Sequence, residues 1–102
     1  MIVYNVTCHL ATDLEPAWLE WMRGEHIPEV MATGCFLDVK IMRLLVNAQD
    51  DEGVNIAIQY TAQDMAAYER YRDEFAPAMQ AKTRERYGEQ VLAYRSLLEV
   101  LG

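Results

Sequence analysis

The chain has 102 residues, of which 52% are hydrophobic, and a formal net charge of −7. This length predicts a single domain over residues 1–102, and the hydrophobic share excludes a disordered tail. The acidic balance argues against nucleic-acid partners and membrane anchors, and no apolar run approaches the ~20 residues of a membrane span. With no signal-peptide pattern and only Cys8 and Cys35, we expect a reduced, soluble, cytoplasmic protein without a disulfide.

The first ten residues alternate in a period of two and include β-branched side chains, which predicts a strand. One face carries an apolar set. The opposite face is more polar, with Val3, Asn5, Thr7 and His9.

A helix is predicted next, with Thr12 as N-cap and Glu15 completing a capping box. Its buried stripe is expected to consist of Leu14, Trp18, Trp21 and Met22.

Pro28 should disturb this helix, because proline has no N–H and its ring crowds the carbonyl of Gly24. We expect a kink or break between these two residues, with the His26 side chain hydrogen-bonded nearby. Gly34 should end the helical segment.

The rest of the chain is predicted to contain three further strands and a second helix. Residues 36–46 and 54–61 read as strands, joined by a polar hairpin connection at 47–53. Thr61 and Asp64 give a cap signal for a second helix, which Pro77 can restart and Gly88 can end. Residues 90–101 form the last strand, in which Leu92, Tyr94 and other apolar residues should face the helices.

The resulting order is β-α-β-β-α-β, the ferredoxin-like α+β fold with sheet order 4-1-3-2 and both helices on one face. The uncovered face is then too apolar for open water and too polar for a dry core. We expect it to pack against a second copy, forming a homodimer, or to surround a ligand. The face is predicted to carry Val3, Asn5, Thr7, His9, Lys40, Met42, Gln59, Ala93, Arg95 and Leu97.

At this level of detail the chain resembles an uncharacterised family of short bacterial proteins, known as a domain of unknown function, in the dimeric α/β-barrel group. The resemblance spans nearly the whole chain. It lies in Trp18-x-x-Trp21-Met22, His26-Ile27-Pro28, Thr33-Gly34, Tyr68-Glu69-x-Tyr71, Glu74-Phe75-Ala76-Pro77, Arg86-Tyr87-Gly88 and Leu97-Leu98-Glu99-Val100. It implies a homodimer whose two sheets face each other, and it implies no reaction or catalytic residue.

The wider group includes cofactor-independent monooxygenases, isomerases and haem-degrading enzymes. The resemblance to haem-degrading members extends to Asn5 on the first strand. Those members also need a tryptophan and a histidine on the second helix, and residues 65–88 contain neither.

His26 is the candidate catalytic residue. A neutral imidazole beside a disturbed helix can donate one nitrogen to a free carbonyl and offer the other to a substrate as a base. The alternative is that His26 only satisfies the kink.

A candidate ligand site lies on the uncovered face. His9 and Arg95 stand on neighbouring strands and would form an anion site there, with Asn5 and Gln59 beside them. The alternative is that Arg95 pairs with a carboxylate across the dimer interface, so that Arg95→Glu weakens assembly.

No metal or cofactor is expected, because the chain has no paired-cysteine, HExxH or phosphate-loop motif. The leading interpretation is a homodimer that binds a small molecule between its sheets. The alternatives are a cofactor-independent monooxygenase or isomerase acting on a small organic substrate, and a metabolite-sensing regulatory module.

Overall fold

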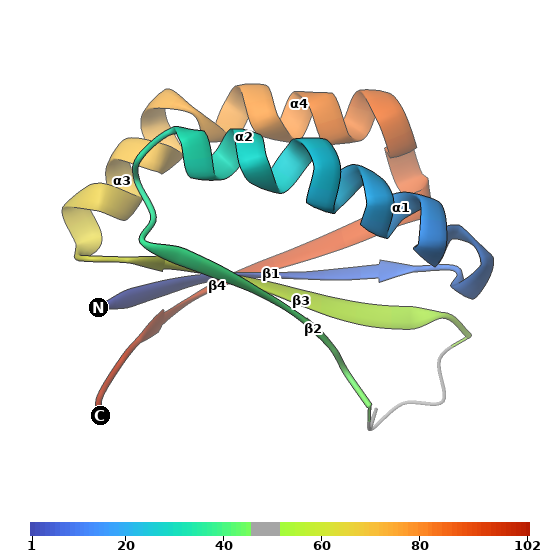
Figure 1. Ribbon diagram of the computed structural model, residues 1–102, viewed down its shortest axis with the longest axis horizontal. Helices are drawn as coiled ribbons and strands as arrows, with labels where there is room; N and C mark the ends of the chain where they lie inside the picture. Colours follow the sequence, from blue (N-terminus) through green and yellow to red (C-terminus); the bar gives the residue numbers. More distant parts are fainter. Residues whose placement is uncertain (46–51) are drawn as a thin grey trace.

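The structure, a computed structural model that describes residues 1–45 and 52–102, is a four-stranded antiparallel sheet with its helices on one face (Figure 1). In chain order the elements are β1 (Ile2–Leu10), a 3₁₀ turn (Thr12–Leu14), α1 (Glu15–Trp21), a π-helical turn (Met22–His26), α2 (Ile27–Ala32), β2 (Asp38–Arg43), β3 (Val54–Ala62), α3 (Met65–Glu74), α4 (Ala76–Tyr87), a 3₁₀ turn (Gly88–Gln90) and β4 (Val91–Glu99).

The strand order is β2-β3-β1-β4, which is the predicted order 4-1-3-2 written in reverse. The α+β ferredoxin-like fold is therefore confirmed. The hairpin connection predicted at 47–53 lies mostly outside the described residues.

Strand register shows which side chains face the helices, because directly paired residues point to the same side of a sheet. For β1, β2 and β3 the predicted faces are correct: Lys40, Gln59 and Asn5 follow one another across the uncovered face.

For β4 the predicted faces are reversed. Arg95 pairs with Val6, and Tyr94 pairs with Thr7. Ala93, Arg95 and Leu97 therefore lie on the helix side, and the uncovered face carries Leu92, Tyr94, Ser96 and Leu98 instead.

The predicted capping box at the first helix is wrong. Thr12 begins a 3₁₀ turn, and the residue before α1 is Leu14, which makes no side-chain cap hydrogen bond. The Glu15 carboxylate instead pairs with the Arg43 guanidinium on β2, so its oxygens are not aimed at the helix N-terminus.

The disturbance before Pro28 takes the form of a π-helical turn over Met22–His26, in which the Ile27 N–H donates to the Met22 carbonyl. Widening the turn by one residue accommodates a residue without an N–H. The irregularity is where it was predicted, but the chain stays helical to Ala32. Gly34 follows the C-cap residue Thr33, as predicted for a glycine that stops the helix, and its φ of 77° favours glycine.

Asp64, and not Thr61, caps the second helical region: its side chain accepts a hydrogen bond of 2.9 Å from the Ala67 N–H. The region is divided at Phe75, and α4 begins with Pro77 in its first turn. It ends at Gly88, where φ is 57°. The restart of the helix at Pro77 and its end at Gly88 both match the prediction.

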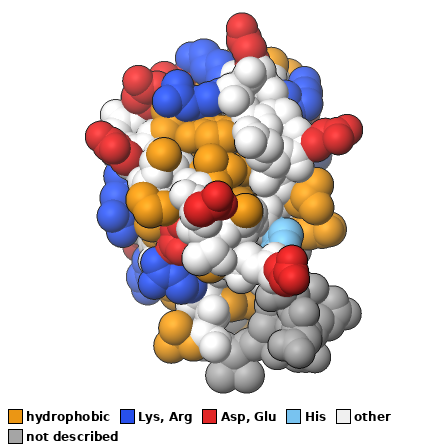
Figure 2. Space-filling model, turned by 90° about the vertical axis from the view of Figure 1, so that its right-hand side faces the viewer, with side chains coloured by type: hydrophobic (Ala, Val, Ile, Leu, Met, Phe, Trp, Pro, Cys, Tyr) orange, Lys and Arg blue, Asp and Glu red, His pale blue; other side chains and the backbone are white. Residues whose placement is uncertain are grey.

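The core lies between the sheet and the helices. Trp18, Leu10, Ile56 and Ile58 are almost completely buried, and Cys8 and Cys35 are buried free thiols. Seen from the end of the sheet where α1 begins, hydrophobic side chains also reach the surface in patches among charged ones (Figure 2). Within the described ranges, no helix has the length and apolar character needed to cross a membrane.

Candidate functional site

The sheet divides the residues singled out from the sequence into two groups. Asn5, His9 and Gln59 lie on the uncovered face, whereas Arg95 lies on the helix side together with His26. The expected meeting of His9 with Arg95 is therefore wrong. The reason is that the side chains of β4 alternate in the opposite phase to the predicted one, so the Arg95 guanidinium lies on the helix side of the sheet.

On the uncovered face, Asn5 is held by its neighbours. Its Nδ2 donates to Thr7 Oγ1 at 3.0 Å and to Ser96 Oγ at 3.4 Å. Gln59, on the adjacent strand β3, is its partner in the strand register. His9 lies at the far end of β1, where its Nδ1 contacts Asn55 Oδ1 at 3.0 Å. These side chains form a polar row on an open sheet and do not converge on one point.

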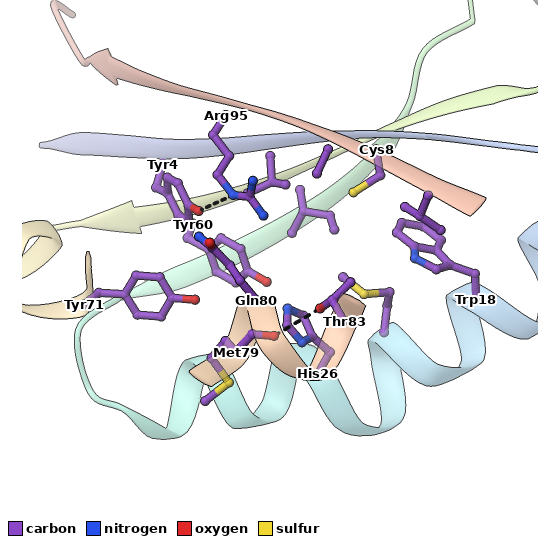
Figure 3. A pocket seen from close by; sticks show the side chains of 15 residues that line it. Tyr4, Cys8, Trp18, His26, Tyr60, Tyr71, Met79, Gln80, Thr83 and Arg95 are labelled. Carbon is purple, nitrogen blue, oxygen red and sulfur yellow. Dashed lines mark hydrogen bonds between the residues drawn. The ribbon is translucent and has the colours of Figure 1, made fainter. Parts of the chain in front are cut away.

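On the helix side, a cavity of about 60 Å³ lies between the sheet and the helices. Figure 3 shows Arg95 entering it from β4, His26 from the π-helical turn and Gln80 from α4. Its lining combines aromatic, aliphatic and polar side chains: Tyr4, Val6, Cys8, Trp18, Met22, His26, Ile58, Tyr60, Tyr71, Met79, Gln80, Thr83, Val91, Ala93 and Arg95.

The charged group of this cavity is the Arg95 guanidinium. Its Nε donates to the Tyr4 hydroxyl at 3.1 Å (Figure 3). Among the described residues, no carboxylate lines the cavity or forms an ion pair with Arg95. Arg95 is an exposed residue, so its remaining guanidinium N–H groups are open to a group that enters from solvent.

Two nitrogens at the cavity have no hydrogen-bond partner in the described part of the chain. They are Trp18 Nε1 and His26 Nδ1, and both are buried. The Nδ1 atom of His26 therefore lacks the hydrogen bond that the sequence predicted for this side chain. Its ring stacks instead on Trp21, with centroids 5.1 Å apart.

Burial shifts the pKa values of three side chains that line the cavity, those of His26, Cys8 and Tyr4. It lowers the pKa of His26 below its usual value of 6.5, an effect that Glu29 opposes and that Lys82 and Arg95 reinforce. The imidazole is therefore neutral at pH 7. Burial also raises the pKa of the Cys8 thiol to about 11 and keeps the Tyr4 phenol protonated, although Arg95 acts against the shift at both groups.

His26 also lines a groove on the outer surface, between the first helical segment and α4. The groove has a volume of about 420 Å³, and the Lys82–Glu29 ion pair, at 2.6 Å, crosses between its two walls. His26 therefore separates the inner cavity from the solvent-facing groove.

Most of the cavity lining was missed as a site, although much of it was predicted to be core. Trp18, for example, belongs to the predicted buried stripe of the first helix. What spacing along the chain does not reveal is that these core side chains line the same cavity as Gln80 and Thr83 from α4. No group of three metal-ligating side chains occurs within residues 1–45 and 52–102.

A family model described as "Domain of unknown function (DUF4286)" matches residues 1–101 of the chain. No curated protein matches it.

Two solved structures have a similar fold. An ethyl tert-butyl ether d (ethd) family protein from Bacillus halodurans is 15% identical, with a TM-score of 0.68, and the match covers 99% of this chain and 100% of that one. A dimeric ferredoxin-like protein from an uncultured marine organism is also 15% identical, with a TM-score of 0.60 and coverage of 99% and 95%. At this identity the likeness concerns the fold alone.

Proposed function

The chain belongs to the family described as a domain of unknown function (DUF4286), and from its cavity and its uncovered sheet face we propose that it is a homodimeric protein that binds a small molecule. We place the ligand site in the cavity between the helices and the sheet, and not between two facing sheets. In this proposal residues 1–102 form one domain, and the protein works in the cytoplasm.

The unpartnered nitrogens of Trp18 and His26 carry the ligand proposal. Leaving a buried donor or acceptor unpaired costs roughly 1–3 kcal/mol, and buried polar groups in proteins rarely remain so. Here two such atoms belong to the same cavity, beside a guanidinium with free donors. A ligand that pairs with these groups would recover that cost on binding, which is how a small site gains affinity.

The uncovered sheet face supports the dimer. With β4 in its observed register, this face carries exposed Leu92, Tyr94, Leu98 and Met42, with exposed fractions of 47%, 64%, 46% and 40%. No helix covers that side among the described elements (Figure 1). Leu92, Tyr94 and Leu98 line the β4 edge of this face and Met42 its β2 edge. Exposed apolar side chains at both edges favour an interaction surface, and a self-complementary two-fold contact would bury on the order of 1,200–2,000 Å².

The dimer also finds support in one structural neighbour, which is itself described as dimeric. In such a dimer, the polar row of Lys40, Gln59, Asn5 and Ser96 would lie at the interface. Asn5 is already hydrogen-bonded within its own chain, so part of this row can be buried without leaving its polar atoms unpaired.

Native mass spectrometry tests both halves of the proposal. We expect twice the 11.8 kDa chain mass, with a retained adduct when the protein is taken from its own host. Ala93→Met places a larger side chain in the cavity and should remove the adduct without removing the dimer. Ala66→Met, at an exposed position on α3, is the matched control and should retain it. An adduct that persists in Ala93→Met contradicts the site, and a monomeric mass contradicts the dimer.

A second candidate function is a cofactor-independent monooxygenase or isomerase. It is favoured by one observation: a neutral imidazole and a guanidinium line the same cavity. A base beside a cation can remove a proton from a carbon and stabilise the resulting oxyanion. Incubation of the identified ligand in deuterated water tests this function: exchange at one carbon that His26→Gln abolishes supports it, and no exchange contradicts it.

A further inference from the structure

Several hydrogen-bonding groups at the cavity can donate, and two of them, the Trp18 indole and the Arg95 guanidinium, can only donate. The phenols of Tyr4, Tyr60 and Tyr71 are protonated at neutral pH, and burial raises their pKa values further. The Trp18 indole donates only, and Arg95 has five N–H groups and no acceptor. Such a lining is complementary to an acceptor-rich ligand.

The charge of the cavity points in the same direction. Arg95 is a permanent cation, and its Nε–H is taken by the Tyr4 hydroxyl. Its two terminal nitrogens remain, and they form the fork that carboxylates bind with two parallel hydrogen bonds. No aspartate or glutamate of the described chain competes for that position.

Size and polarity narrow the ligand further. A volume of about 60 Å³ corresponds to roughly two water molecules at liquid density. The remaining wall is aliphatic, with Val6, Met22, Ile58 and Val91. A carboxylate with a short alkyl chain suits both the cation and the aliphatic wall. Propionate, with five non-hydrogen atoms, exceeds two water volumes, so lining side chains must shift to admit it, and a ring-bearing ligand would need a still larger opening.

We propose that the cavity binds a short-chain carboxylate, with its oxygens on Arg95 and its alkyl part against the aliphatic wall, and that His26 takes up a proton on binding. This inference rests on the proposed function, since it assigns a ligand class to the same cavity.

Proton uptake follows from the surroundings of His26. Glu29 on α2 favours the charged imidazole, whereas burial, Lys82 on α4 and Arg95 on β4 disfavour it. The other charged groups of the adjoining groove are Glu25, Glu85 and Arg86. An anion bound in the cavity offsets the effect of Arg95 and offers Nδ1 an acceptor. Both effects raise the pKa of His26, so that a larger fraction of the imidazole is protonated at neutral pH.

Isothermal titration calorimetry with propionate, at neutral pH, is the first arm of the test. Propionamide is the matched neutral probe, because it has nearly the same shape and no charge. We expect propionate to bind at least about tenfold more tightly than propionamide. Titrations in Hepes and in Tris should give different apparent enthalpies, because the two buffers release the captured proton at different enthalpic cost.

Three variants form the second arm. Arg95→Gln should weaken propionate binding by at least about tenfold, and the exposed control Arg84→Gln should not change it. His26→Gln should retain binding but lose the dependence of the enthalpy on the buffer.

The two arms separate the possible failures. Equal binding of propionate and propionamide, or an Arg95→Gln variant that binds propionate as the wild type does, overturns the ligand class. If Ala93→Met still removes the native adduct in that case, the proposed function stands without it. A buffer-independent enthalpy in the wild-type protein overturns the role of His26.

Discussion

Replacing His26 by phenylalanine should make the protein more stable. The ring of His26 stacks on Trp21 at a centroid distance of 5.1 Å, and a phenyl ring keeps this contact. The substitution removes Nδ1, a buried nitrogen without a partner among the described residues. Removing an unpaired polar atom from a buried site recovers roughly 1–3 kcal/mol. Allowing for imperfect packing of the new ring, we expect the free energy of unfolding to rise by about 1–2 kcal/mol at neutral pH.

The gain should grow as the solution becomes acidic. Burial holds the pKa of His26 below 6.5 in the folded chain, so the unfolded chain binds more protons between the folded-state pKa and 6.5. In that window the stability of the wild-type protein rises with pH and is lost as the pH falls. His26→Phe has no such group and lacks this contribution to the pH dependence.

Urea denaturation followed by tryptophan fluorescence measures both effects. Protein concentrations must be equal, because association makes apparent stability depend on concentration. An increase of about 1 kcal/mol shifts the melting temperature by roughly 4–8 °C in a domain of this size. His26→Gln, which keeps a polar group at the site, is the matched control and should show no gain. A Phe variant no more stable than the wild type would mean that Nδ1 is already satisfied, and the reasoning about the cavity would fail.

Three further outcomes follow from other parts of the molecule. Tyr94→Glu, on the uncovered sheet face, should shift the protein from dimer to monomer in sedimentation experiments, and an unchanged dimer would place the interface elsewhere. Asp64→Ala removes the hydrogen bond to the Ala67 N–H and should cost about 1 kcal/mol in urea denaturation, with Asp64→Asn retaining most of the stability. The Cys8 thiol, whose pKa is raised to about 11, should resist iodoacetamide in the folded protein at neutral pH, and fast alkylation would contradict its burial.

Elements with one clearly apolar face could be predicted from the sequence. β1 and β3 alternate cleanly, and this alternation, with two helical stretches between strands, was enough for the sheet order and for the helices' position on one face. Helix ends were also predictable where glycine adopts a positive φ, at Gly34 and Gly88. These features depend on local chemistry that each stretch carries by itself.

The wrong predictions concern features that tertiary contacts determine: the face on which a side chain lies and the partner that it binds. β4 has large side chains on both faces, so alternation does not show which face the helices cover, and Arg95 was assigned to the wrong one. Glu15 had the spacing of a capping residue but was drawn to Arg43 on β2, far along the chain. In both cases the deciding partner lies on another element.

The candidate site was predictable only in part, for the same reason. His26 was found because Pro28 disturbs the helix beside it. The chemistry around His26 comes from β1, β3, β4 and α4 together. Residues such as Gln80 and Thr83 carry no signal in the sequence, because a glutamine or a threonine on a helix is ordinary until the cavity beneath it is known.

A crystal structure of the protein purified from its own host, without added ligand, tests the central claim most directly. The account predicts density larger than water between the helices and the sheet, with polar atoms within hydrogen-bond distance of Trp18 Nε1 and His26 Nδ1. A cavity that holds only water, or a ligand bound instead between the two facing sheets of a dimer, would contradict it.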